Sequence, residues 1–327
     1  MMVRRPFVIF ALIAVGLVAA PGAADAQQSV KIPRIGYLSP VSHPREADFR
    51  QELRRLGYFE GENITIEYRS AQGNFNRLPE LAAELVDLEV DVIVAQVTQA
   101  AIAAKKATAT IPIVMIAVSD PVASGLVASL AHPGGNVTGT SAVAADVVGK
   151  QLELVRELVP GVSSVAALWN PANRIFQGQQ LREARAAAAE LKLRVRILEA
   201  RDAKEIDSAF GILARERASA LLLMGDPVFT THARQIAGLA LEHGLPTVGS
   251  ASVLAEAGVL LTYGPSYEDA FRGAAVYVDR ILKGAKPADL PVERSVRFEL
   301  VVNEKTAASL GVTLPQSLVL RADQVIK

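Results

Sequence analysis

The sequence predicts an α/β protein made of two lobes, each a doubly wound, mainly parallel sheet covered by helices. The first reason is a series of short apolar runs that are continuous rather than alternating, as in parallel strands buried on both faces. The second is that stretches with helical spacing separate these runs, so that strand and helix alternate along the chain. The third is glycine and proline punctuation at three places, which we interpret as crossings between the lobes.

Strands and helices are expected in a regular order. The apolar runs that predict strands lie at residues 35–38, 92–95, 113–118, 165–169, 220–224 and 259–263. The first helix carries Phe49, Leu53 and Leu56 at positions i, i+4 and i+7, and Gly57 follows as a stop signal. A similar apolar face recurs in Leu78, Leu81, Leu85 and Leu88, and again in Ile206, Phe210 and Leu213. A long helix is expected from about residue 145 to residue 159.

The three crossings define the expected lobes. They are the glycine-rich stretch 134–139, the Gly264-Pro265 pair and the segment 286–291. They place residues 30–140 and 265–289 in one lobe, and residues 141–264 and 290–327 in the other. The alternative is that all three are ordinary surface loops, in which case the strands would form one very wide sheet.

Composition excludes several classes of protein. The 327 residues contain 34 lysines and arginines against 34 aspartates and glutamates, and this balance argues against a nucleic-acid-binding protein. The chain has no cysteine, which excludes disulfides, cysteine-ligated metal sites and a thiol nucleophile. Half of the residues are apolar, which predicts a large core rather than disorder.

The first 26 residues predict an export signal that is cleaved after Ala26. Arg4 and Arg5 precede an uncharged run at residues 7–20, and Ala24-Asp25-Ala26 fits the small-x-small cleavage pattern. The alternative is a membrane anchor, but the run is shorter than the roughly 20 residues that span a bilayer. We therefore expect the mature protein in the periplasm.

Polar residues followed by proline end several of the predicted strands. The pairs are Ser39-Pro40, Asp120-Pro121, Asn170-Pro171 and Asp226-Pro227. Capping of the next helix explains each pair by itself. In open α/β sheets, however, ligands bind outside the carboxyl ends of the strands, where helix N-termini also favour anionic groups. The four polar residues are therefore candidates for a ligand crevice between the lobes.

Three further residues each have a structural and a ligand-binding interpretation. Trp169 and Tyr263 end predicted strands, and each is either a core side chain or a wall of the crevice. Ser141 follows the glycine-rich stretch and either binds ligand or shapes a turn.

Catalytic and cofactor motifs are lacking. Gly134 and Gly139 have the spacing of a phosphate-binding loop, but Thr140 stands where that loop needs lysine. The sequence contains no dinucleotide fingerprint after the first strand and no G-x-S-x-G nucleophile elbow. Its four histidines have no metal-ligand spacing, and we interpret them as surface or helix-end residues. These features favour a binding protein without cofactor or metal over an enzyme.

Several segments form recognisable motifs: IGYLSP (35–40), FRQELRRLGY (49–58), AVSDPVASGLV (117–127), PGGNVTG (133–139), LWNP (168–171) and YGP (263–265). In their order and spacing they resemble the ABC-transporter substrate-binding protein family, in the branch that includes tryptophan and phenylalanine binders. The resemblance covers about residues 32–325. It implies the type I periplasmic-binding-protein fold, with three crossovers and a ligand held between the lobes, and it implies separate permease and ATPase subunits.

The resemblance also implies positions for the pocket. Together with the strand-end candidates, the expected ligand-binding residues are Ser39, Gln96, Thr98, Asp120, Ser141, Trp169, Asn170, Asp226, Ser250 and Tyr263. Relatives often have a glycine-threonine-proline turn where this chain has Gln96-Val97-Thr98, and many have an aromatic residue at the position of Gly249.

The sequence as a whole predicts a monomeric transport receptor that captures a small polar solute, with an amino acid or related small carboxylate as the first expectation. Asp120 is expected to pair with a ligand amine or hydroxyl, and helix N-termini with a carboxylate. The alternative in the same fold is a periplasmic sensor that feeds a membrane signalling protein. An enzyme built on two α/β lobes is a more distant alternative.

Overall fold

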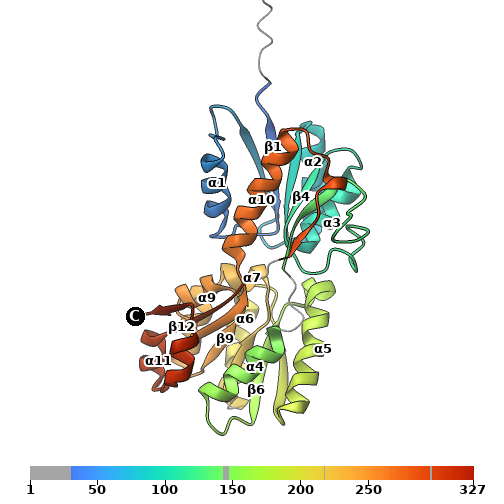
Figure 1. Ribbon diagram of the computed structural model, residues 1–327. Helices are drawn as coiled ribbons and strands as arrows, with labels where there is room; N and C mark the ends of the chain where they lie inside the picture. The colour runs from blue at the N-terminus through green and yellow to red at the C-terminus, as the bar shows by residue number, and fades with distance from the viewer. Residues whose placement is uncertain (1–30, 143–146, 217, 295–296) are drawn as a thin grey trace, which may run out of the picture. The chain divides into compact units, whose positions relative to one another are not determined.

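Two separate sheets form the framework of the protein, as the sequence predicts (Figure 1). The computed structural model describes residues 31–142, 147–216, 218–294 and 297–327, apart from the side chains of residues 175 and 176. Within these residues, one sheet has six strands in the order β11-β5-β4-β3-β1-β2 and the other has seven in the order β13-β12-β10-β9-β8-β6-β7. The predicted export signal at residues 1–26 lies outside the described residues. We call the first sheet with its helices lobe 1 and the second sheet with its helices lobe 2.

Lobe 1 is a parallel sheet buried on both faces. Its strands are β1 (Arg34–Ser39), β2 (Thr65–Ser70), β3 (Val92–Gln96), β4 (Ile113–Val118), β5 (Val137–Ser141) and β11 (Glu293–Arg294). Helices α2 (Leu78–Asp87) and α3 (Val97–Ala107) pack on one face, and α1 (Glu46–Arg55) and α10 (Tyr267–Leu282) on the other. Every residue of β3 and β4 is buried, which explains why these strands read as continuous apolar runs.

Lobe 2 repeats the design with one antiparallel pair. Its strands are β6 (Ser164–Trp169), β7 (Arg194–Glu199), β8 (Ala220–Leu223), β9 (Thr247–Gly249), β10 (Leu261–Pro265), β12 (Phe298–Asn303) and β13 (Gln324–Ile326). One face carries α4 (Val147–Leu158), α5 (Arg174–Glu190), α11 (Glu304–Leu310) and α12 (Gln316–Arg321). The other carries α6 (Ala203–Glu216), α7 (Pro227–Thr231), α8 (Ala233–Glu242) and α9 (Ser252–Glu256). The antiparallel pair is β10 with β12.

The chain passes between the lobes at three places, and the first and last differ from the expectation. The stretch 134–139 leads into β5 of lobe 1, so Ser141 belongs to lobe 1 and the first crossing comes after it. Helix α10 follows β10 of lobe 2 but packs on the sheet of lobe 1, and its orange ribbon lies among the blue elements in Figure 1. The segment after α10 stays in lobe 1, because Glu293 and Arg294 pair with β5. The turn at 286–291 is therefore not the crossing, and residues 290–294 do not belong to the second sheet.

Hydrogen bonds explain why this segment stays in lobe 1. Thr138 Oγ1 donates to the carbonyl oxygen of Leu290 at 2.7 Å, and the backbone N–H of Val292 donates to the carbonyl oxygen of Leu130 at 2.7 Å. The hydroxyl of Tyr277 donates to the carbonyl oxygen of Pro291. Long-range contacts of this kind leave no pattern in the local sequence. Pro287 and Pro291 therefore predict a turn but do not show which lobe the turn belongs to.

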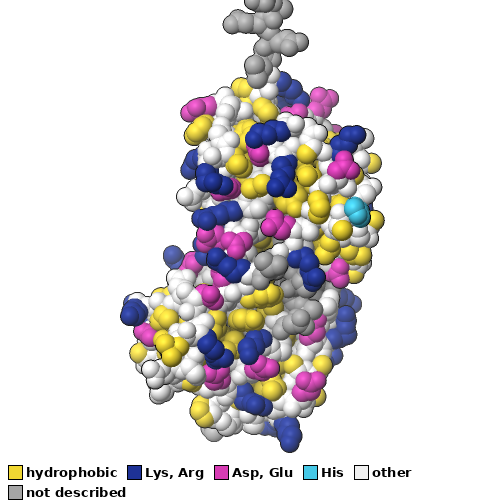
Figure 2. All heavy atoms as spheres, in the orientation of Figure 1, with side chains coloured by type: hydrophobic (Ala, Val, Ile, Leu, Met, Phe, Trp, Pro, Cys, Tyr) yellow, Lys and Arg dark blue, Asp and Glu magenta, His cyan; other side chains and the backbone are white. Residues whose placement is uncertain are grey.

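Charges of both signs are mixed on the face of the molecule shown in Figure 2. Figure 2 shows lysine and arginine side chains mixed with aspartate and glutamate over the visible face, in keeping with 34 residues of each kind in the sequence. Among the described residues, no helix is long and apolar enough to cross a membrane.

Gly139 allows β5 to approach β4 closely. Its φ is +128°, and a Cβ at this position would lie 2.3 Å from the carbonyl oxygen of Met115. Gly139→Ala is therefore expected to lower the free energy of unfolding by roughly 2–4 kcal/mol, because it combines an unfavourable backbone conformation with a clash against backbone. Urea denaturation of the ligand-free protein would measure the change.

The matched control is Gly135→Ala. A Cβ on Gly135 has nothing within 4 Å. This variant is expected to unfold within about 0.5 kcal/mol of the parent. Equal stabilities of the Gly139 and Gly135 variants would contradict the close approach.

Candidate functional site

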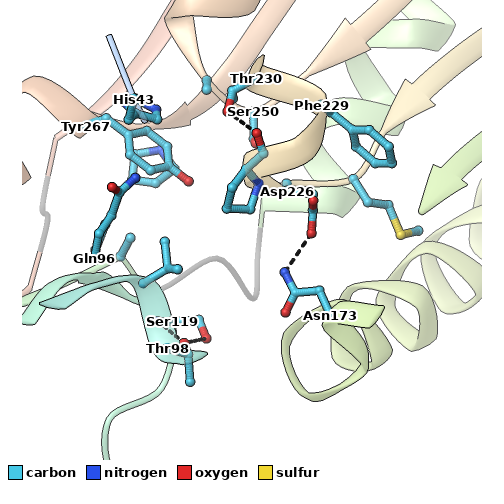
Figure 3. Close-up of a pocket in the computed structure, with 18 of the residues that line it drawn as sticks. His43, Gln96, Thr98, Ser119, Asn173, Asp226, Phe229, Thr230, Ser250 and Tyr267 are labelled. Atoms are coloured by element: carbon cyan, nitrogen blue, oxygen red, sulfur yellow. Dashed lines mark hydrogen bonds between the residues drawn. The ribbon is translucent and has the colours of Figure 1, made fainter. Parts of the chain in front are cut away.

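A pocket lies where carboxyl ends of strands from both sheets meet (Figure 3). Lobe 1 contributes the residues that follow β3 and β4, and lobe 2 contributes those that follow β8 and β9. The polar side chains on its wall belong to His43, Gln96, Thr98, Gln99, Ser119, Asn173, Gln180, Asp226, Thr230, Ser250 and Tyr267. Parallel strands all end at the same edge of their sheet, and this shared edge brings together residues far apart in the sequence.

The turn from β3 into α3 forms the lobe 1 wall. Gln96 is the N-cap of α3, and its side chain makes no capping hydrogen bond. The next residue, Val97, has a φ of +59°, an uncommon conformation for a β-branched residue that costs about 1–3 kcal/mol. The hydroxyl of Thr98 lies 3.2 Å from the hydroxyl of Ser119 and accepts the Ser119 backbone N–H at 3.4 Å. This wall therefore combines a helix N-terminus with two hydroxyl groups.

A buried carboxylate forms the lobe 2 wall. Asp226 is 5% exposed and caps α7, since its Oδ1 accepts the backbone N–H of Val228 at 2.9 Å. The same oxygen accepts from Nδ2 of Asn170 at 3.1 Å, and Oδ2 accepts from Nδ2 of Asn173 at 2.8 Å. Burial raises the pKa of Asp226 to about 6, while the hydrogen bonds from Asn173, Asn170 and Val228 act in the opposite direction.

His43 and Tyr267 form a third wall. The ring of His43 stacks on those of Tyr267 and Phe271, with centroids 5.6 and 5.1 Å away. Burial, with a smaller contribution from the charge of Arg45, lowers the pKa of His43 to about 4, so the ring is neutral at pH 7. The interpretation of His43 as a surface or helix-end residue is therefore wrong: it is 6% exposed.

Two contacts join the lobes beside the pocket. The guanidinium of Arg45, in lobe 1, pairs with the carboxylate of Glu256 and donates to Oγ of Ser252 at 3.2 Å. Nε2 of Gln99 at the start of α3 donates to Oδ1 of Asn173. Asn173 thus connects the Asp226 carboxylate to lobe 1.

The structure brings four of the sequence-predicted residues to the pocket wall: Gln96, Thr98, Asp226 and Ser250. A fifth, Asn170, lies behind the wall and donates to Asp226. Whether these residues bind a ligand stays a prediction, but their convergence follows from the strand-end pattern that singled out Asn170 and Asp226.

The other predicted residues do not line the pocket. Ser39 and Ser141 are buried at the ends of β1 and β5, and Trp169 belongs to the core of lobe 2. Tyr263 packs against that core and stacks on Phe298, with centroids 5.9 Å apart. Asp120 is exposed, and its Oδ1 accepts the backbone N–H of Ala123 at 2.9 Å. No helix lies between β4 and β5, a stretch that the structure describes in full, so Asp120 caps a turn at residues 121–125 rather than the helix that the sequence predicts.

Sequence reasoning missed several residues on the wall. Ser119 immediately precedes Asp120, and Asn173 lies three residues after Asn170, so both are close in sequence to candidate ligand-binding residues. His43 also precedes a proline, in the loop beyond the Ser39-Pro40 pair, and this polar-proline signal could have identified it. Tyr267 lies on α10 and reaches the pocket only because that helix packs on lobe 1.

Comparisons with known proteins agree on one family. The sequence family described as "ABC transporter substrate binding protein" matches residues 34–326. A tyrosine-binding protein of Clostridioides difficile is 31% identical over 288 residues, which are 86% of this chain and 82% of that protein.

Solved structures show the same similarity. A conserved domain protein from Vibrio cholerae superposes with a TM-score of 0.82 at 30% identity, over 90% of this chain and 100% of that one. An ABC domain from Streptococcus pneumoniae in complex with L-Trp superposes with a TM-score of 0.81 at 28% identity, over 90% of this chain and 99% of that one. The architecture is that of type I periplasmic binding proteins, which confirms the predicted fold.

Asp120 provides a test of the capping interpretation. Asp120→Asn is expected to change the free energy of unfolding by less than about 0.5 kcal/mol and to leave ligand affinity unchanged, because asparagine can accept the Ala123 N–H in the same turn. Asp120→Ala removes the acceptor of the Ala123 N–H in an exposed turn and is expected to lower the free energy of unfolding by about 0.5–1 kcal/mol. Thermal melts with and without ligand would measure both. A smaller ligand-induced shift in the asparagine variant would instead place Asp120 in the binding site.

Proposed function

Since the chain belongs to the ABC transporter substrate-binding protein family, which binds solutes rather than catalysing reactions, we propose that it is the extracytoplasmic receptor of an ABC importer for an amino acid. The observation that carries the proposal is the pairing, across one pocket, of a helix N-terminus on lobe 1 with a buried carboxylate on lobe 2. A free amino acid carries the two complementary charges.

The carboxylate of the ligand is expected at the start of α3. The first backbone N–H groups of a helix have no partner within the helix and carry a partial positive charge. Because the Gln96 side chain does not cap them, they remain available to a ligand anion. The hydroxyls of Thr98 and Ser119 on the same wall are hydrogen-bonded to each other, which leaves one of their two O–H groups as a further donor.

The ammonium group of the ligand is expected at Asp226. An ionised carboxylate offers about four lone-pair sites, and three donors of the protein already occupy Asp226. One site remains for a ligand donor. Neutralising a buried carboxylate with a cation offsets its desolvation, so this contact favours a cationic ligand group over a neutral one.

Aromatic amino acids are the first candidates. The curated relative is named for tyrosine, and the structure from S. pneumoniae contains L-Trp. The pocket of this chain supplies apolar wall from Phe229, Met224 and Leu254. Many relatives have an aromatic residue at the position of Gly249. In this chain there is no room for a side chain there, since a Cβ would lie 2.6 Å from Cδ1 of Leu254. Leu254 therefore occupies part of the volume that such an aromatic ring would need.

The proposal includes the partners and the compartment that the family implies. The receptor is exported by the signal at residues 1–26, is cleaved after Ala26, and acts in the periplasm as a monomer. It delivers its ligand to a permease driven by ATPase subunits.

A binding panel tests the function. The exported protein is expected to bind at least one of the twenty amino acids, and a ligand at 100 times its Kd stabilises the fold by about 2.7 kcal/mol. For a chain of this size the midpoint of thermal unfolding should rise by several degrees. A panel in which sugars or polyamines raise the midpoint and no amino acid does would contradict the proposal.

Affinity for the amino acid is expected to fall as the pH drops below 6. Asp226 has a pKa of about 6 in the ligand-free protein, so at lower pH it is protonated and must lose its proton before it pairs with an ammonium group. The loss approaches tenfold per pH unit well below pH 6, and above about pH 7 affinity should be flat. Calorimetric titrations between pH 4.5 and pH 8 would measure this.

Asp226→Asn is the matched control for the pH dependence. It is expected to bind about 10- to 150-fold more weakly at pH 7.5, because it loses a charge-assisted hydrogen bond. Its affinity should vary little between pH 5 and pH 7. An unchanged pH profile in this variant would assign the titration to another group.

A further inference from the structure

The proposed amino-acid pocket contains two polar atoms that the protein itself leaves unsatisfied. Nε2 of His43 and Oε1 of Gln96 are buried and have no hydrogen-bond partner among the described residues. Both residues line the pocket, and in Figure 3 the Gln96 side chain extends toward His43 and Tyr267. A buried polar atom without a partner is costly, so atoms of this kind on a pocket wall indicate what a ligand must supply.

His43 is held as a hydrogen-bond donor at Nε2. The backbone N–H of Arg45 donates to Nδ1 at 3.1 Å, so Nδ1 is an acceptor and the single proton of the neutral ring lies on Nε2. The loop around the ring is closed by two further bonds: the backbone N–H of His43 donates to Oε1 of Glu46 at 2.9 Å, and the backbone N–H of Glu46 donates to the carbonyl oxygen of His43 at 3.0 Å. Stacking on Tyr267 and Phe271 fixes the plane of the ring.

The two unsatisfied atoms are complementary to a single chemical group. Nε2–H of His43 needs an acceptor, and Oε1 of Gln96 needs a donor. A hydroxyl is both, with one O–H and two lone pairs. A hydrocarbon side chain satisfies neither atom, and an indole N–H satisfies only Gln96.

The part of the pocket formed by His43, Gln96 and Tyr267 is separate from the two positions where the charged groups of the ligand are expected. In Figure 3, His43, Gln96 and Tyr267 lie apart from Thr98 and Ser119, where the carboxylate is expected, and from Asp226, where the ammonium group is expected. When the charged groups of an amino acid are bound at those two positions, its side chain can occupy the space beside His43, Gln96 and Tyr267.

We propose that His43 and Gln96 form a specificity subsite that selects an amino acid whose side chain carries a hydroxyl. The hydroxyl oxygen accepts from Nε2–H of His43, and its proton is donated to Oε1 of Gln96. This inference rests on the proposed function and adds the chemical class of the side chain.

The test compares ligands that differ by one hydroxyl. Calorimetry is done with L-tyrosine against L-phenylalanine, and with L-threonine against its near-isostere L-valine. The hydroxylated member of at least one pair is expected to bind about 5- to 100-fold more tightly, since the apolar partner leaves both buried atoms unpaired.

Two substitutions of His43 separate its functions. His43→Asn keeps an acceptor for the Arg45 N–H but has no atom at the position of Nε2, and it should reduce the hydroxyl preference to within about twofold. His43→Gln reaches that position with an amide N–H and should restore part of the preference. Gln96→Met, which removes the acceptor at similar volume, should also weaken the preference.

The outcomes are distinguishable. Binding of amino acids with no hydroxyl preference, or equal losses for both members of a pair in His43→Asn, would overturn the subsite and reduce His43 to a wall of the pocket. Absence of binding by all four amino acids and by the rest of the panel would overturn the proposed function, and the subsite with it. A hydroxyl preference that disappears in His43→Asn and returns in His43→Gln supports the assignment.

Discussion

Burial of the Asp226 carboxylate is the constraint on which the geometry of the site depends. A carboxylate that is 5% exposed needs hydrogen-bond donors, and it takes them from Asn170, Asn173 and the start of α7. These donors come from the ends of two neighbouring strands, β6 and β8, so the carboxylate holds the two turns in one arrangement. Asn173 then accepts from Gln99 of lobe 1. One buried charge thus organises the lobe 2 wall and connects it to the opposite wall.

The polar groups of the pocket fall into two kinds with different consequences. Thr98, Ser119 and Asp226 have partners within the protein, and such satisfied networks are rigid before any ligand arrives. His43 Nε2 and Gln96 Oε1 have none among the described residues, so a bound molecule with a matching donor and acceptor would satisfy them. Within the part of the chain that the structure describes, Trp169 Nε1 and Ser141 Oγ also have no hydrogen-bond partner, but neither residue lines the pocket, so they carry no information about a ligand.

Strand ends explain why part of the site was visible in the sequence. Asp226 and Asn170 both precede proline and follow apolar runs, and parallel strands bring such positions to one edge. Asp120 has the same local pattern, yet its turn leaves the side chain in solvent. The pattern identifies the edge of the sheet, whereas the direction of each turn decides which side chain enters the pocket. His43 and Tyr267 were missed because neither follows an apolar run directly: His43 lies in the loop after β1, and Tyr267 is the first residue of α10.

The sequence by itself determined the fold class, the alternation of strands and helices, and the net charge of zero. Burial on both faces requires continuous apolar runs, and helix amphipathicity requires a 3.6-residue period, so both leave local patterns. Only the tertiary structure decided that residues 293–294 pair with β5, that α10 returns to lobe 1, and that Nδ1 of His43 accepts from Arg45. Strand pairing and hydrogen-bond satisfaction join residues remote in the chain, and their energies depend on positions in space that no local stretch of sequence encodes.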